Sequence, residues 1–197
     1  MSIDDNQPEL LSEDEYVEAS NKMSIMLAQL GVDTSEIQRR LVDSIIEACD
    51  GFTSEIEVES KANELYGLIF HEQIEGYING ASYFVKTFTE CGKSLGIKLK
   101  IISVDEISVN ADTSHEYIIE STTKLLSILI EHMTSPNEES AESFRAKINL
   151  AISMYMDTSF ILGLTDAKSL NYFANKAEGV EMGELIKLLE EVFPRIF

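Results

Sequence analysis

The sequence predicts an all-α protein, a single bundle of six or seven helices with one long central helix. Apolar residues recur at intervals of three and four over most of the chain. Residues that cap helices precede several of these segments, and only three prolines and ten glycines occur among 197 residues. We expect residues 12–197 to form a single helical domain after a mobile acidic tail at residues 1–11.

Helices are expected at seven places along the chain. Their starts are indicated by patterns such as Ser-x-x-Glu and their ends by glycines. The expected ranges are 12–30, 34–50, 54–91, 113–133, 136–162, 165–177 and 181–193. The start signals are "SEDE" at Ser12, "DTSE" at Asp33, "TSHE" at Thr113 and "SPNE" at Ser135. The end signals are Gly31, Gly51, Gly92 or Gly96, Gly163 and Gly179.

The longest expected helix, residues 54–91, carries the clearest apolar pattern. Its apolar residues are Leu65, Leu68, Ile69, Ile74, Tyr77, Ile78, Ala81, Phe84, Val85 and Phe88. A second central helix is expected at residues 113–133, because its "LLSILI" segment is apolar almost all round. These two helices are predicted to form the centre of the bundle.

The segment between residues 96 and 110 interrupts the helical pattern. "GIKLKIISV", which begins at Gly96, alternates apolar and basic residues as a half-buried strand does. "SVDE" at Ser103 would instead cap another short helix. A lone strand would lack a partner unless residues 107–109 returned to pair with it. We expect a short irregular or hairpin-like connector here.

The formal net charge of −20 is concentrated in the N-terminal third of the chain. Residues 1–60 hold fifteen acidic and three basic side chains, a net charge of −12, which leaves −8 for the rest. A field of this sign repels phosphate backbones and anionic membrane surfaces, so we expect no direct nucleic-acid binding and no membrane binding. It favours a basic protein partner or a divalent cation. The simpler alternative is a solvated surface without a specific role.

The two cysteines, Cys49 and Cys91, are too few and too far apart for a disulfide framework or a zinc site. The N-terminal segment lacks the basic and apolar regions of a signal peptide. No apolar run approaches the length of a membrane span. These features predict reduced thiols and a cytoplasmic location.

The segment "FHEQIEGYINGASYF", residues 70–84, holds the main candidate site residues. His71, Glu72 and Glu75 are the metal candidates, but "HEQIE" matches only the first two residues of the His-Glu-x-x-His zinc pattern. No third protein ligand is identifiable, and no glutamate lies three residues before a histidine, as di-iron bundles require. We therefore expect no metal and no other cofactor.

Glycines inside the same helix indicate close helix packing. A helical glycine costs about 0.5–1 kcal/mol relative to alanine. Gly76 and Gly80 share one face, which would let another helix approach closely. The alternative is a small pocket beside these glycines, walled by Tyr77, Tyr83 and Phe84.

The C-terminal segment carries an apolar stripe that suits either a core or an interface. Its residues step by three or four positions. They are Met182, Leu185, Leu189, Val192 and Ile196. We favour core packing, and a partner interface or a homodimer is the alternative.

The sequence favours a non-enzymatic role, because no catalytic pattern accompanies its abundant carboxylates. We expect a small acidic cytoplasmic protein–protein interaction module. One version is an inhibitor or decoy that binds a basic surface of another protein. The alternative is an all-α enzyme, or a binder of a small molecule or metal, that uses the His71 region.

Overall fold

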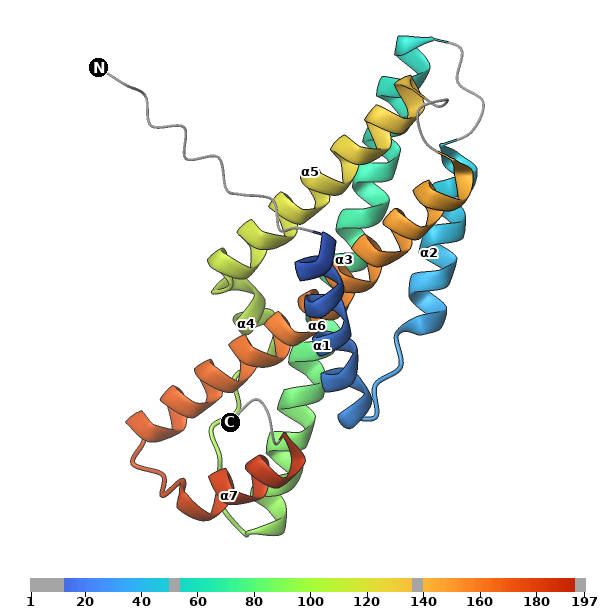
Figure 1. Ribbon diagram of the computed structural model, residues 1–197. Coiled ribbons are helices and arrows are strands. Elements are labelled where there is room, and N and C mark those ends of the chain that lie inside the picture. Colours follow the sequence, from blue (N-terminus) through green and yellow to red (C-terminus); the bar gives the residue numbers. More distant parts are fainter. Residues whose placement is uncertain (1–12, 50–53, 136–139, 194–197) are drawn as a thin grey trace, which may run out of the picture.

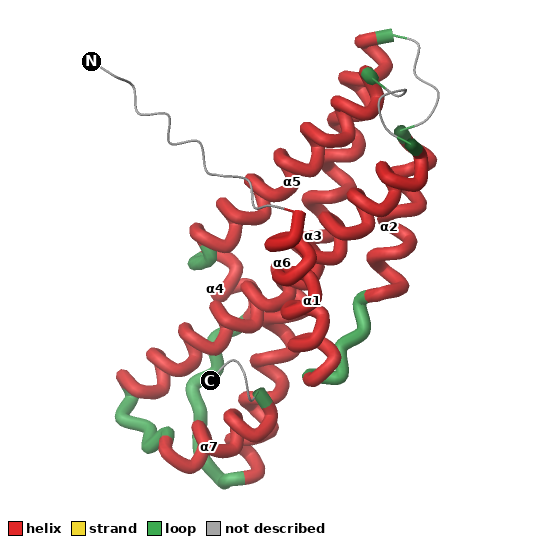
Figure 2. Tube along the Cα trace, viewed as in Figure 1, coloured by secondary structure: helices red, strands yellow, loops and turns green. Residues whose placement is uncertain are grey.

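The computed structural model describes residues 13–49, 54–135 and 140–193. Within these ranges the chain forms seven helices and no strand, as Figure 1 and Figure 2 show. The helices are α1 (Glu13–Gln29), α2 (Ser35–Ala48), α3 (Glu55–Ser94), α4 (Val104–Val109), α5 (Asp112–Thr134), α6 (Ala141–Ala177) and α7 (Gly183–Val192). The predicted all-α bundle is confirmed. The tail expected at residues 1–11 lies outside the described residues.

Two long helices form the centre of the molecule. α3 has 40 residues and α6 has 37, and they cross near their middles (Figure 1). α2 and α5 pack beside one half of this pair, α4 and α7 beside the other half, and α1 lies across α6. The apolar segment at 113–133 predicts a second central helix, but α6 occupies that place, and Ile130 of α5 is exposed.

The apolar core has two parts, one on each side of the crossing. The first consists mainly of α2, the first half of α3, the second half of α5 and the first half of α6. The second consists mainly of α7 and the second halves of α3 and α6. Aromatic residues concentrate in the second part: Tyr77, Phe84, Phe88, Phe160 and Phe193. The helical spacing of apolar residues thus corresponds to the faces that these helices bury.

The helix end predicted at Gly163 is wrong. α6 continues through this residue, so the ranges 136–162 and 165–177 belong to one helix. Gly163 lies where α6 crosses α3, and a Cβ atom there would overlap the backbone carbonyl of Tyr77. The glycine is needed for close approach between helices. In contrast, Gly31 and Gly179 have φ values of 70° and 75° and follow the ends of α1 and α6, as predicted.

Serine side chains cap three of the helices. Each accepts a hydrogen bond from the backbone N–H three residues later, and the three are Ser54, Ser103 and Ser140. The helix start predicted at Thr113 is correct to within one residue, because α5 begins at Asp112. The cap predicted there is wrong, since Thr113 lies inside the first turn and Ala111 is the N-cap residue. The start predicted at Ser135 is also wrong, because Ser135 ends α5 and α6 begins at Ala141 after the cap Ser140. Ser12, where another start was expected, lies outside the described residues.

The connector between α3 and α5 is irregular and contains the short helix α4. It has no partner strand within the described part of the chain, and side chains of α6 bind its backbone instead. The Asn175 amide donates to the carbonyl of Lys100 at 2.7 Å and accepts from its N–H at 2.8 Å. Asn171 accepts from the N–H of Ile102 at 2.9 Å. Both asparagines are fully buried.

α6 is long and apolar enough to cross a membrane, judged by length and composition alone. The expectation that no apolar run approaches the length of a membrane span is wrong by this criterion. Within the structure, 61% of the apolar window is buried. The finding is weak evidence for a membrane span, because the buried core helix of a soluble protein passes the same test.

Candidate functional site

The candidate site is an open cavity of about 400 Å³ between α1, the α1–α2 loop, α2 and α6. Polar and apolar side chains both line it. The lining residues are Ser24, Leu27, Ala28, Gly31, Val32, Asp33, Thr34, Ser35, Gln38 and Asp157. Its volume is within the range of ligand pockets, which span roughly 300–1,000 Å³.

Local structure at the α1–α2 junction places the polar groups of this cavity. α1 ends at a turn in which the N–H of Val32 donates to the carbonyl of Leu27 at 3.0 Å, and the left-handed backbone of Gly31 makes the turn possible. The Asp33 carboxylate then accepts from the N–H of Ser35 at 3.0 Å, at the start of α2. Thr34 precedes α2, but its hydroxyl does not cap the helix. That hydroxyl is directed toward α6 instead.

Asp157 of α6 is the charged group at the centre of the site. Its side chain is only 1% exposed. One carboxylate oxygen accepts from the Thr34 hydroxyl at 2.8 Å and the Gln38 amide at 2.7 Å. The other oxygen accepts from the Ser24 hydroxyl at 3.0 Å. One residue of α6 thereby binds α1, the α1–α2 loop and α2.

The electrostatics of the cavity are those of a buried carboxylate that lacks a counter-charge. Burial raises the pKa of the Asp157 carboxyl above its ordinary value, and the hydrogen bonds from Thr34, Ser24 and Gln38 oppose this shift without cancelling it. The second carboxyl, Asp33, is exposed, and the Ser35 hydroxyl and N–H hold its pKa below the ordinary value. The lining residues include no lysine, arginine or histidine. The arrangement is suited to holding a cation.

The metal candidates predicted on α3 lie apart from this cavity. His71 and Glu75 are exposed, and Glu72 is half-buried beside a smaller cavity of about 260 Å³ between α2 and α3. Among the described residues, no three His, Cys, Asp or Glu side chains gather closely enough to hold a metal ion. Binding of a small molecule near His71 stays a prediction.

The interior residue of "HEQIE" is Gln73, which is fully buried. Its amide donates to the Thr122 hydroxyl at 2.8 Å and accepts from the Ser121 hydroxyl at 2.8 Å. These two bonds join α3 to α5. Gln73, a polar residue of this segment, therefore has a structural role, because it joins two helices.

Gly76 and Gly80 of α3 lie against α6. A Cβ atom at Gly80 would overlap the backbone carbonyl of Phe160. This contact is reciprocal, because Gly163 of α6 lies against the carbonyl of Tyr77. A Cβ atom at Gly76 would lie 3.6 Å from the carbonyl oxygen of Met156, an ordinary contact. The closest approach thus uses one glycine from each helix.

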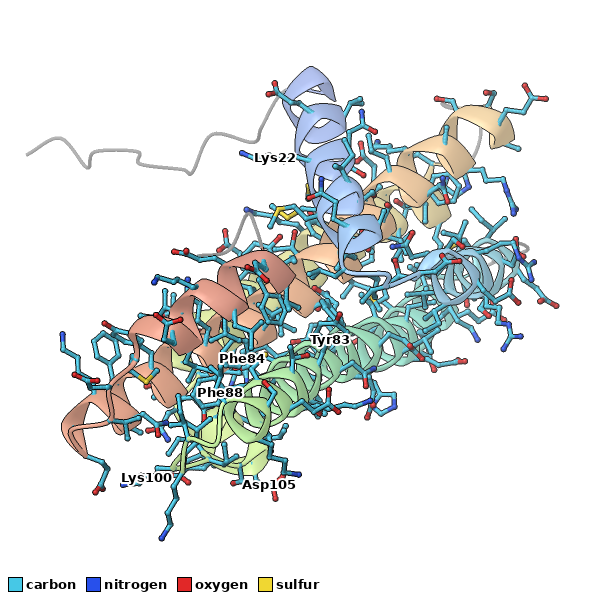
Figure 3. The ribbon with its side chains drawn as sticks, turned by 90° about the horizontal axis from the view of Figure 1, so that it is seen from below. Lys22, Tyr83, Phe84, Phe88, Lys100 and Asp105 are labelled. Atoms are coloured by element: carbon cyan, nitrogen blue, oxygen red, sulfur yellow. The ribbon has the colours of Figure 1, made fainter. Side chains whose placement is uncertain are left out.

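The aromatic residues beside these glycines contact other rings. Figure 3 shows Phe84 between α3 and the C-terminal helices. The Tyr83 ring lies 6.1 Å from the Phe160 ring and 6.0 Å from the Phe193 ring, and the rings of Phe84 and Phe193 are 5.6 Å apart. These contacts favour close packing over a pocket walled by Tyr77, Tyr83 and Phe84.

A second polar cluster joins α3, α5 and α6 near Tyr77. The hydroxyls of Tyr77 and Ser114 both donate to one oxygen of Asp166, at 2.9 and 2.7 Å. Burial, followed by the contact with Asp166, raises the pKa of Tyr77 above its ordinary value. The edge of the His115 ring packs on Tyr77 with 5.7 Å between centroids. The Nε2 atom of this histidine is buried without a hydrogen-bond partner among the described residues.

The C-terminal apolar stripe belongs largely to the core of the chain. Met182, Leu185 and Leu189 are buried, and Val192 is partly buried. Ile196 lies outside the described residues. The burial of these side chains favours core packing over the alternative of a partner or dimer interface.

Asp157 and its three donors were not identified from the sequence, although one signal pointed to the aspartate. Apolar residues lie three positions before it, three after it and seven after it: Met154, Phe160 and Leu164. A carboxylate within an apolar helical face is unusual, because aspartate is almost never fully buried unless it is paired. This spacing could have identified Asp157, whereas its donors come from segments more than 100 residues away.

The fold and the site define an all-α bundle with a buried carboxylate in the wall of an open cavity. Comparison of the chain with protein-family models, curated proteins and solved structures finds no match. Any function is therefore argued from the geometry of the site and the charge of the surface.

Proposed function

We propose that this protein is a small acidic interaction module whose N-terminal third binds a basic surface of another protein. The supporting observation is that six of the seven acidic side chains described in this third are exposed, and the seventh, Asp43, is half-buried. The exposed carboxylates are Glu18, Asp33, Glu36, Glu47, Glu57 and Glu59. Such a field attracts a basic partner and accelerates its association.

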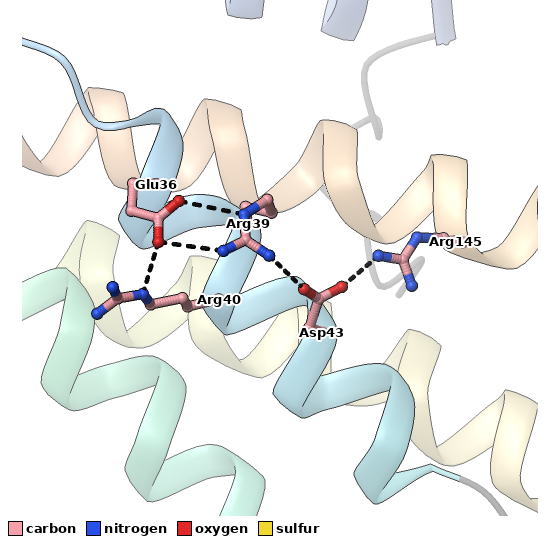
Figure 4. A network of polar contacts seen from close by, with 5 residues as sticks. All are labelled: Glu36, Arg39, Arg40, Asp43 and Arg145. Atoms are coloured by element: carbon pink, nitrogen blue, oxygen red, sulfur yellow. Dashed lines mark hydrogen bonds and ion pairs between the residues drawn. The ribbon is translucent and has the colours of Figure 1, made fainter.

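The arginines of α2 are already engaged by neighbouring carboxylates. Figure 4 shows Arg39 and Arg40 on Glu36, at 3.0 and 2.8 Å, and Arg39 on Asp43 at 3.0 Å. Arg145 of α6 contacts the same Asp43. These pairs are exposed, so each contributes only about 0–1 kcal/mol to stability. The hydrogen bonds from Arg39 and Arg40 hold the pKa of Glu36 below its ordinary value, so this carboxyl is ionised at neutral pH.

Lys22 is the remaining basic residue of the N-terminal third and is exposed on α1 (Figure 3). One positive charge there leaves the negative field of the surrounding carboxylates dominant. One version of the proposal is a cytoplasmic inhibitor or decoy that covers the basic groove of its target. The role is then steric and electrostatic, without a chemical step.

The test measures binding of the full chain to a basic partner captured from a native lysate. Affinity is followed by interferometry as the salt concentration rises from roughly 50 to 500 mM, where screening of exposed charges becomes strong. The triple variant Glu18→Gln, Glu47→Gln and Glu59→Gln is expected to weaken binding by about tenfold or more.

The matched control removes three equally exposed carboxylates near the C-terminus: Glu181→Gln, Glu190→Gln and Glu191→Gln. Both variants have the same net charge, so only the position of the lost charge differs. We expect the control to bind almost as the unmodified protein does. Equal losses in the two variants, or binding that salt does not weaken, would contradict the proposal.

A further inference from the structure

We propose that the cavity between α1, α2 and α6 binds an alkylammonium group, with the Asp157 carboxylate as its counter-charge. The inference rests on the proposed function for the source of this group, which is a lysine side chain of the basic partner. A free alkylamine has the same chemistry and is the other source. In both cases the cation is an alkylammonium group, and it binds in this one cavity.

No cation among the residues that line the cavity balances the charge of Asp157. A buried carboxylate is normally paired with a cation, because isolated charges are costly to remove from water. Asp157 is only 1% exposed, and its three donors are two hydroxyls and an amide. These neutral groups orient the carboxylate but supply no positive charge to balance it. A ligand that supplies one positive charge would complete the site.

Oxygen atoms around the Asp157 carboxylate retain the capacity to accept further hydrogen bonds. The carboxylate oxygen bound only by Ser24 keeps a free lone pair, and the Ser24 hydroxyl oxygen keeps its own acceptor capacity. Thr34 donates to Asp157 and accepts from Gln38 at 2.9 Å, which leaves its oxygen one more site. An ammonium group carries three N–H donors that can reach separate oxygens. A guanidinium fork fits less well, because donors already occupy both oxygens of Asp157.

The walls of the cavity are partly apolar. Leu27, Ala28 and Val32 line the same cavity, and methylene groups of an alkylammonium stem pack on such surfaces while the charged end reaches a polar group. The exposed carboxylate of Asp33 also lines the cavity and adds to its attraction for a cation. The cavity thus combines an apolar wall with an anionic end.

The test titrates the full chain with n-butylammonium chloride and, separately, with N-acetyl-lysine methylamide. Backbone ¹H–¹⁵N chemical shifts of residues 24–38 and 157 report binding at the cavity. Neutral n-pentanol, which has a similar size, is the control for apolar contact alone. We expect saturable shifts with the ammonium probes and at least about tenfold weaker binding to Asp157→Asn, in which the counter-charge is lost.

The matched control is Asp105→Asn, which also removes one carboxylate. Asp105 is exposed on α4, and Figure 3 shows it on the side of the molecule away from α1. This variant is expected to bind as the unmodified protein does. Ala28→Leu is a second variant, which fills the cavity from an exposed position on α1 and leaves the Asp157 carboxylate in place. It is expected to block the ammonium probes while Asp157 is retained.

Three results would overturn the inference: neither ammonium probe binds, n-pentanol causes equal shifts, or Asp157→Asn and Ala28→Leu both bind undiminished. Binding of both ammonium probes supports a lysine side chain as the ligand, and binding of n-butylammonium alone supports a free amine. The two proposals can fail separately. If the captured partner binds the N-terminal triple variant more weakly but the cavity binds no ammonium probe, the proposed function stands and this inference fails. If the cavity binds the ammonium probes but salt does not weaken partner binding, the inference about the cavity stands and the proposed function fails.

Discussion

Asp157 shows how two opposing effects act on one carboxyl group. Burial disfavours its ionised form, whereas hydrogen bonds from Ser24, Thr34 and Gln38 favour it. Burial is the larger effect, so the pKa of Asp157 in the folded protein lies above its ordinary value of 3.8. The folded chain therefore binds a proton at this site more tightly than the unfolded chain does. This difference links the stability of the fold to pH.

We predict that Asp157→Asn raises the free energy of unfolding at pH 7. Because the folded pKa is raised, the stabilising contribution of Asp157 is fully present below its unfolded pKa and is lost as pH rises through its folded pKa. An asparagine is neutral throughout this window. Its amide oxygen can accept from Thr34 and Gln38, and its NH2 group can donate to the Ser24 hydroxyl oxygen, which reverses the direction of that bond. The advantage of the variant should shrink as pH falls toward 4, as measured by urea unfolding at several pH values.

Asp105→Asn is the control for this prediction, because Asp105 is exposed. Asp33 lines the same cavity and is present in both proteins, and its pKa lies below its ordinary value of 3.8, so this carboxyl stays largely ionised across the pH range compared. An asparagine variant that is less stable at pH 7 than at pH 4, relative to the unmodified protein, would show that hydrogen bonding outweighs burial.

At the scale of elements, the crossing of α3 and α6 depends on two glycines that remove side-chain atoms from the contact. Gly80 lies against the carbonyl of Phe160 and Gly163 against that of Tyr77. Backbone atoms cannot move aside as a flexible side chain can. An added methyl group at either position must separate the two longest helices.

We predict that Gly80→Ala lowers the free energy of unfolding by about 1–3 kcal/mol, the usual cost of overpacking. Chemical denaturation measures this loss. Gly67→Ala is the matched control on the same helix, because nothing lies within 4 Å of a Cβ atom there. The control should gain about 0.5–1 kcal/mol from the better helix propensity of alanine. A Gly80 variant as stable as the Gly67 variant would mean that the helices do not pack as closely as described.

The connector before α5 also depends on α6, because side chains of α6 bind its backbone. Its backbone hydrogen bonds go to Asn171 and Asn175, one helical turn apart on α6, instead of to a strand. This arrangement explains why an alternating, strand-like sequence forms no strand among the described residues. The connector is therefore held by side chains of the core.

We predict that Asn171→Ala accelerates hydrogen exchange at the Ile102 N–H by about tenfold or more, because an unsatisfied buried donor costs roughly 1–3 kcal/mol. Exchange followed by NMR resolves this amide from its neighbours. Asn149→Ala, at an exposed position of the same helix, is the control and should leave the Ile102 amide unchanged. Unchanged exchange in the Asn171 variant would show that another group holds this N–H.

At the scale of the whole molecule, the net charge of −20 opposes compaction. Exposed carboxylates repel one another over distances near the Debye length, which is about 10 Å at 0.1 M salt. The ion pairs within α2, and the pair that joins Arg145 of α6 to Asp43 of α2, are exposed, so they offset little of this repulsion. Screening by salt should therefore stabilise the fold.

We predict that the melting temperature rises by about 2–4 °C, equivalent to roughly 1 kcal/mol for a chain of this size, when sodium chloride increases from roughly 20 to 300 mM. Scanning calorimetry measures the change, and potassium chloride should have the same effect if screening is the cause. The variant with Glu181, Glu190 and Glu191 replaced by glutamine should respond less. A melting temperature that falls with salt would mean that attractive ion pairs dominate.

Several features of this protein follow from short stretches of sequence. The helical class, most helix positions, the glycine ends at Gly31 and Gly179 and the serine caps depend on residues within one or two turns. The prediction at Gly163 was wrong because a glycine that ends a helix and a glycine that admits another helix look the same locally. Only the position of α3 relative to α6 distinguishes them.

The sequence by itself determined the all-α class, the helical faces that are buried and the excess of negative charge, because each depends on composition or on near neighbours along the chain. The tertiary structure alone decided which glycines meet, what binds the connector and which carboxylate is buried in a cavity wall. Asp157 and Ser24 are 133 residues apart, so their hydrogen bond arises only when α1 packs on α6. Burial and pairing at such distances follow from how the helices pack, which local periodicity does not specify.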